Sequence, residues 1–164
     1  MSLRFSLPLG GHSENAVAPA DLGAAGAQSS FLSMVNADQL YFCGYYAAGA
    51  SGNGPVLVVE AASDAAGTGA SAVALSEIWT KVGSGEWTRV PAVDRQSTVA
   101  SYDTDAVGGD DEALEFIIRI HDGDLAEGKT HVRINNAAAG GNRTGYVHAV
   151  SDQRSYAGKN SPAL

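Results

Sequence analysis

The strongest constraint on the fold is the stretch ALEFIIRIH, residues 113–121. Its apolar residues Phe116, Ile118 and Ile120 fall at every second position, with Glu115 and Arg119 on the opposite face. Successive side chains of a strand point to opposite faces, so a period of two is typical of a strand that is buried on one face only. The stretch therefore predicts a half-buried strand that packs on a core.

Further segments of strand character follow one another along the chain, separated by clusters of Gly, Asn, Asp and Ser. They cover residues 39–47, 55–62, 74–81, 86–90, 130–135 and 145–150. In the segment at 130–135, Val132 and Ile134 repeat the alternation and are expected to point inward. No helical period extends over ten residues. We predict an all-β protein, a single antiparallel β-sandwich or jelly roll of about seven or eight strands.

The two ends of the chain differ in composition from the middle. Residues 10–30, GGHSENAVAPADLGAAGAQSS, are rich in Gly, Ala and Ser and have no sustained apolar period. Such a segment buries too little apolar surface to order itself. We therefore expect an extended N-terminal arm over residues 1–30, a β-sandwich domain over residues 31–150 and a C-terminal tail over residues 151–164.

Charge and hydropathy exclude several classes of partner. The net charge of −8 and the pI of about 4.7 disfavour binding to phosphates, so we expect no direct contact with nucleic acid. No stretch approaches the roughly 18 to 20 apolar residues of a membrane span, so we expect no membrane association. No secretory signal is evident, so we expect the protein to be made in a cytoplasm. The single cysteine, Cys43, lies in an apolar run and is interpreted as a small buried residue.

Two tryptophans flank a glycine-rich turn in SEIWTKVGSGEWTRVP, residues 76–91. Gly83 and Gly85 can adopt the positive φ angles that a short connection needs, so the pattern predicts a hairpin with Trp79 and Trp87 on its two arms. The indoles could pack on the core or its edge, form a subunit interface, or provide a platform on which a sugar stacks. Such a platform would also use the tyrosines Tyr41, Tyr45 and Tyr46.

Acidic residues gather in the loop YDTDAVGGDDE, where the candidate contact residues are Asp103, Asp105, Asp110 and Asp111. Three interpretations stay open, namely a solvated loop, a contact with a basic partner surface, and a calcium site. The spacing does not match an EF-hand loop. The four histidines are scattered, although His121 and His131 would approach each other if their strands formed a hairpin.

The sequence lacks the motifs that carry common chemistries. It contains no strand-turn-helix nucleophile elbow, no Walker loop, no dinucleotide fingerprint and no Cys/His zinc pattern. Together with the all-β prediction, this favours a protein that is not an enzyme and has no catalytic residues, no cofactor and no metal site.

The order of three segments resembles that of small β-sandwich head decoration or accessory virion proteins of tailed bacteriophages. These segments are NADQLYF at 36–42, VLVVE at 56–60 and the Gly-turn-Trp hairpin at 81–90. The resemblance extends over residues 30–150, and this sequence departs from it by a long insertion before the hairpin and by the acidic loop at 102–112.

The resemblance implies a structural virion protein that decorates or stabilises the capsid of a phage head through its arm, loops and sheet edges. The implied partners are the major capsid protein or other virion proteins, together with further copies of the same chain, for which a trimer is the state suggested by analogy. The implied location is the virion. Two other hypotheses come from different classes, a carbohydrate-binding β-sandwich module and, more remotely, a fragment of a secreted hydrolase.

Overall fold

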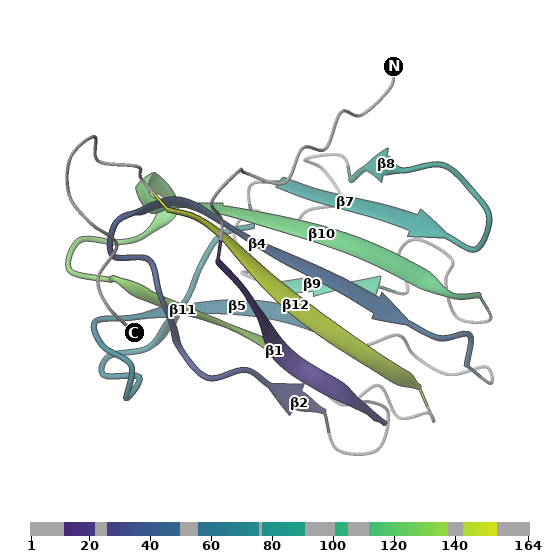
Figure 1. The fold of residues 1–164 in the computed structure, drawn as a ribbon, viewed down its shortest axis with the longest axis horizontal. Coiled ribbons are helices and arrows are strands. Elements are labelled where there is room, and N and C mark those ends of the chain that lie inside the picture. The colour runs from purple at the N-terminus through teal and green to yellow at the C-terminus, as the bar shows by residue number, and fades with distance from the viewer. Residues whose placement is uncertain are drawn as a thin grey trace.

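The computed structural model describes residues 12–21, 26–49, 56–75, 77–90, 101–104, 112–137 and 143–153. Apart from one short 3-10 helix, the regular structure of these residues consists of β-strands in two antiparallel sheets (Figure 1). The prediction of an all-β sandwich is confirmed. Within the part of the chain that is described, no helix has the length and apolar character needed to cross a membrane.

Sheet A lies in front of sheet B in Figure 1, with its long strands side by side. Neighbouring strands of sheet A are, in spatial order, β1 (His12–Asp21), β12 (Thr144–Gln153), β4 (Ala37–Tyr46), β10 (Leu114–His121), β7 (Glu77–Val82) and β8 (Thr88–Arg89). Sheet A thus has one long edge strand, β1, and one short edge strand, β8.

Sheet B is built on two central strands, β11 (His131–Asn136) and β5 (Val56–Ala62). Short strands flank this pair. On the side of β11 they are β2 (Ala27–Gln28) and β3 (Leu32–Ser33), and on the side of β5 they are β6 (Ser71–Ala72) and β9 (Ser101–Asp103).

The core fills the space between the sheets, and the predicted alternation holds. Phe116, Ile118 and Ile120 of β10 are fully buried, as are Val132 and Ile134 of β11. The remaining large buried side chains come from both sheets and include Leu40, Phe42, Tyr46, Leu57, Ile78, Tyr102 and Leu114. The large residues therefore stabilise this alanine-rich chain, because each buries much more apolar surface than an alanine.

Gly44 allows a close approach at the centre of sheet A. It pairs with Phe116 across β4 and β10, and a Cβ atom at position 44 would lie 2.1 Å from Cζ of the Phe116 ring. The ring thus occupies the space that a side chain at position 44 would need.

Part of the N-terminal arm expected over residues 1–30 is a strand instead, because residues 12–21 form β1 and pair with β12, whereas residues 1–11 lie outside the described residues. An edge strand can be held by backbone hydrogen bonds and a single buried contact, here Val17 at 5% exposure, so it needs no apolar period. At the other end, β12 continues to Gln153, past the expected domain boundary at residue 150, and residues 154–164 of the expected tail lie outside the described residues.

A second difference concerns the link between β10 and β11. The 3-10 helix η2 (Asp122–Asp124) and the residues after it carry the chain from sheet A to sheet B. His121 and His131 therefore lie in different sheets, and the hypothesis that they meet in a hairpin is wrong. The chain turns at Asp122 and Gly123, and a hydrogen bond from the Leu125 N–H to the Asp122 carbonyl, at 3.1 Å, closes this turn.

Candidate functional site

The outer face of sheet A, turned away from the core, collects most of the aromatic residues that the sequence singles out. The strand register arranges its side chains in rows that run across β12, β4, β10 and β7. The first row is Tyr146, Tyr45, Glu115 and Lys81, the second is His148, Cys43, Ile117 and Trp79, and the third is Val150, Tyr41, Arg119 and Glu77. These three rows are called the outer face of sheet A below.

The tryptophan hairpin forms as predicted, with Trp79 of β7 opposite Arg89 of β8. Gly83 has a φ of 51°, which fits its predicted role in the turn. Trp87 is half-buried and precedes the paired part of β8, so the two indoles are not direct cross-strand partners. The sequence could not settle this point, because the register depends on where the turn begins.

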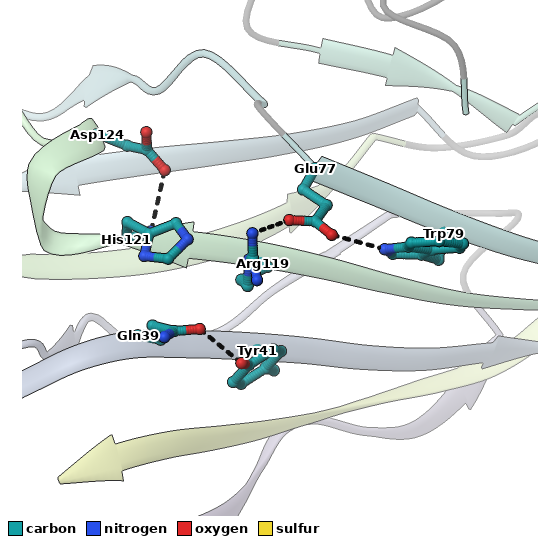
Figure 2. A network of polar contacts seen from close by, with 7 residues as sticks. All are labelled: Gln39, Tyr41, Glu77, Trp79, Arg119, His121 and Asp124. Carbon is teal, nitrogen blue, oxygen red and sulfur yellow. Dashed lines mark hydrogen bonds and ion pairs between the residues drawn. The ribbon is translucent and has the colours of Figure 1, made fainter. Parts of the chain in front are cut away.

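Trp79 is fixed by a polar network on the outer face of sheet A (Figure 2). Its indole Nε1 donates a hydrogen bond to Oε1 of Glu77 at 2.9 Å, and the other carboxylate oxygen of Glu77 forms an ion pair with Arg119. Glu77 therefore holds an aromatic and a cationic side chain at once. A half-buried indole whose N–H group is already engaged offers mainly its apolar surface to a partner.

The outward tyrosines form a second group. The rings of Tyr45 and Tyr146 lie 5.8 Å apart, and the ring of Tyr146 meets His148 edge-on at 5.5 Å. Tyr41 donates its hydroxyl hydrogen to Oε1 of Gln39 at 2.6 Å. Tyr146, which the sequence analysis did not single out, is 37% exposed and is the most accessible of the three tyrosines on this face.

Tyr46 does not belong to this face. It follows Tyr45 directly in β4, so its side chain points to the opposite side of the sheet, and it is fully buried in the core. A platform built from Tyr41, Tyr45 and Tyr46 together is therefore wrong. The Phe116 ring lies 5.3 Å from that of Tyr46.

Cys43 also lies on the outer face rather than in the core, and it is half-buried there. Its neighbours in register are His148 on one side and Ile117 on the other. Burial raises the pKa of the Cys43 thiol to about 11. The thiol is consequently protonated and weakly nucleophilic at neutral pH.

A second candidate region lies at the end of the sandwich where β4 and β11 end. Tyr46 of sheet A donates its hydroxyl hydrogen to Oδ1 of Asn136 in sheet B, at 2.5 Å. Burial raises the pKa of the Tyr46 phenol far above its usual value, and the charge of Arg143 opposes that rise. The phenol therefore stays neutral and keeps its hydrogen-bond donor.

Arg143 extends this link to the segments that border the sandwich end. Only 4% of it is exposed. Its Nε donates to the Ala47 carbonyl at 3.1 Å, and its Nη2 donates to the Glu112 carbonyl at 2.8 Å. Its backbone N–H donates to the Asp21 carboxylate at 3.1 Å. We call the group formed by Tyr46, Ala47, Glu112, Asn136 and Arg143 the braced end.

The acidic candidates come shortly before Glu112 of the braced end in the chain. Asp103 is exposed at the end of β9, where it pairs with Val56, whereas Asp105, Asp110 and Asp111 lie outside the described residues. Among the residues that the structure describes, no group of three or more His, Cys, Asp or Glu side chains could hold a metal ion.

Sequence reasoning missed the central residues of both regions. Arg143 stands in the polar stretch GGNRTG, which is typical of a turn, and an arginine there is usually solvated. Asn136 ends a strand in the way that turn residues often do. Glu77 offered a usable signal, because it lies two residues before Trp79 and so shares its face of the strand.

Comparisons with known proteins give one structural likeness. The SPBc2 prophage-derived protein YomS, known from a crystal structure, is similar over 92% of this chain and 100% of its own, with a TM-score of 0.45 and 14% sequence identity. No protein-family model matches the sequence, and no curated protein does.

Proposed function

We propose that this chain is a non-enzymatic structural protein of a bacteriophage particle, which decorates or stabilises the capsid through its loops and sheet edges. The resemblance found in the sequence supports this proposal, because its three segments fall on β4, β5 and the β7–β8 hairpin of one sandwich. The charge balance fits a protein that binds other proteins of the particle rather than its nucleic acid.

The observation that carries the proposal is the braced end. A buried arginine that donates to two backbone carbonyls fixes where the segments at Ala47 and Glu112 leave the sheets. Rigid β scaffolds commonly carry binding function on segments that they hold in this way. The end of the sandwich is therefore the surface we assign to the contact with the capsid.

The partners follow from the same assignment. We infer contacts with the major capsid protein or other virion proteins, and association with further copies of this chain, a trimer being the state that analogy favours. The protein would be made in the host cytoplasm and would end in the virion.

The test compares charge reversals at two exposed turns. Glu86 lies in the turn after β7, at the braced end, and Glu127 lies in the turn after η2, at the opposite end of the strands. The copy number of the chain relative to the major shell protein is measured in purified particles. We expect Glu86→Lys to lower this ratio and Glu127→Lys to leave it unchanged. Absence of the wild-type chain from purified particles, or equal ratios for both variants, would contradict the proposal.

One observation favours a second candidate, a carbohydrate-binding module. Trp79, Tyr41 and Tyr45 share the outer face of sheet A, as stacking on pyranose rings would require. If this function applies, a glycan shifts the tryptophan emission of the free protein, and Trp79→Ala removes the shift while leaving particle association unchanged.

A further inference from the structure

The outer face of sheet A is more apolar than a solvated sheet face usually is. An antiparallel sheet with one face in water normally carries polar side chains there. The central row of this face instead contains Cys43, Ile117 and Trp79, all half-buried, and the first row contains Tyr45 and Tyr146. An apolar surface of this kind is typical of a contact site.

The charges of this face cancel one another. Lys81 lies 2.9 Å from Glu115 in the first row, and Arg119 forms its ion pair with Glu77 in the third row (Figure 2). Because both pairs are neutral as a whole, the net charge of −8 lies elsewhere on the chain. Two copies of this acidic protein therefore repel each other less through this face than through a surface that carries the excess.

The rings of the face are tilted against one another. The ring planes of Tyr45 and Tyr146 form an angle of 32°, and those of Tyr146 and His148 an angle of 77°. A pyranose stacks best on a flat aromatic surface, whereas the side chains of two packed sheets interdigitate. The relief of this face thus fits another protein surface better than a sugar.

We propose that the outer face of sheet A packs on the same face of a second copy, about a twofold axis that runs along the central row. Such a contact is isologous, and it brings the first row of one copy over the third row of the other. Lys81 then faces Glu77 of the second copy, and Glu115 faces its Arg119. Ile117, in the central row, packs on its own counterpart. The proposal does not rest on the proposed function, which assigns the end of the sandwich to the capsid.

Charge complementarity selects this axis over the other one that a pair of sheets could use. A twofold axis along the strands would place β7 of one copy over β12 of the other. Lys81 would then face Tyr146, and Glu77 would face Val150. No opposite charges would meet, whereas the axis along the central row places each charged residue of the face opposite its complement.

The size of the face sets the strength of the contact. Three rows of side chains on four strands cover about 20 Å by 20 Å, or roughly 400 Å² on each copy. A stable complex buries about 800 Å² on each partner. The second copy therefore binds weakly and reversibly, and the dimer forms where the protein is concentrated.

Exchanges of charge within a row test the proposal, because each exchange keeps the ion pair within the copy. The first-row exchange is Lys81→Glu/Glu115→Lys, and the double exchange adds Glu77→Arg/Arg119→Glu in the third row. Sedimentation equilibrium of the full chain measures dimerisation from about 10 μM to about 1 mM, which spans weak association. We expect the first-row exchange to raise the dissociation constant about tenfold, since like charges then face each other. The double exchange should restore it to within about threefold of wild type.

Circular dichroism and the melting temperature establish that each variant is folded. Three results would overturn the proposal, namely a wild type that stays monomeric over the whole range, a first-row exchange that dimerises as wild type does, and a folded double exchange without recovery. A monomeric wild type whose tryptophan emission shifts with a glycan would assign the face to a sugar instead.

Cys43 gives a second readout on the wild-type protein, because it is the single cysteine and lies in the central row. The rate constant for its modification by a soluble disulfide reagent is measured over the same concentrations. We expect this constant to fall by about threefold or more as dimers form and cover the thiol. The control is Cys43→Ala/Ala72→Cys, whose thiol lies at an exposed position of β6 in sheet B and should react at a constant rate. A wild-type rate constant that does not depend on concentration would contradict the proposal.

Discussion

The braced end and the outer face of sheet A use their side chains in opposite ways. At the braced end a cationic side chain, Arg143, is buried so that it can hold backbone carbonyls. On the outer face of sheet A the aromatic rings of Tyr45 and Tyr146 point away from the core, and the charges there are paired with one another.

This difference separates two kinds of candidate site. A buried polar group that satisfies backbone carbonyls is costly to remove, because its partners lose their hydrogen bonds in a dry environment. Paired charges on a partly exposed face contribute little, since water and salt screen them. Mutations at the braced end should therefore affect stability most, and mutations on the outer face should mainly alter surface properties.

The largest expected effect is that of Arg143→Met. The Ala47 and Glu112 carbonyls lose their donors, and we expect the free energy of unfolding to fall by about 3 kcal/mol. Urea denaturation measures this change. Arg143→Lys is the control and should restore only part of the loss, because an ammonium group lacks the geometry of the guanidinium fork. If Arg143→Met lowered the free energy of unfolding by less than Arg119→Met does, the braced end would not be the more stabilising of the two regions.

Tyr46→Phe should have the next largest effect. It removes the hydroxyl that donates to Asn136 and leaves a buried amide oxygen without that donor, so we expect a loss of about 1 to 2 kcal/mol. The same denaturation experiment applies, with Tyr45→Phe on the outward side of the strand as the matched control. If both tyrosine variants lost the same free energy of unfolding, the hydrogen bond from Tyr46 to Asn136 would contribute no more to stability than the outward hydroxyl of Tyr45.

On the outer face, Arg119→Met should cost less, about 1 kcal/mol, because the ion pair with Glu77 is partly solvated. The tryptophan emission should shift as well, since Glu77 then holds Trp79 less firmly. Lys81→Met is the control, because it removes the more exposed pair with Glu115 and should leave both the stability and the emission close to wild type.

Near neutral pH the smallest effect is that of Cys43, because its contribution to stability changes only in alkaline solution. Burial raises the thiol pKa from 9.0 to about 11 in the folded protein, so the unfolded chain loses this proton first. The contribution is fully present below pH 9 and is lost as the pH rises from about 9 towards 11. The pH dependence of urea unfolding checks this. In the Cys43→Ala variant the free energy of unfolding should fall less steeply between pH 9 and pH 11. If its pH dependence equals that of wild type, the thiol is not shielded from water.

The sandwich itself was predictable because its central strands carry strong patterns. The alternation around Phe116 and Ile118 identifies β10, and the glycines between Trp79 and Trp87 identify the hairpin. The strand β1 was not predictable in the same way, because an edge strand is specified by the backbone of its neighbour β12 and carries no apolar period.

The candidate sites were only partly predictable. Consecutive strand residues point to opposite faces, so the sequence alone could have separated Tyr45 from Tyr46. The role of Arg143 could not be foreseen, since its carbonyl acceptors belong to residues 31 and 96 positions away in the chain. Such contacts follow from the arrangement of the sheets and leave no local pattern.

The close approach of Gly44 and Phe116 has a consequence for sequence divergence. A methyl group at position 44 would overlap the aromatic ring, so neither position can change size independently. Chains that descend from a common ancestor with this one should vary at the two sites together, with a small residue at one accompanying a large residue at the other. That covariation would trace this sandwich through relatives whose overall sequences have diverged.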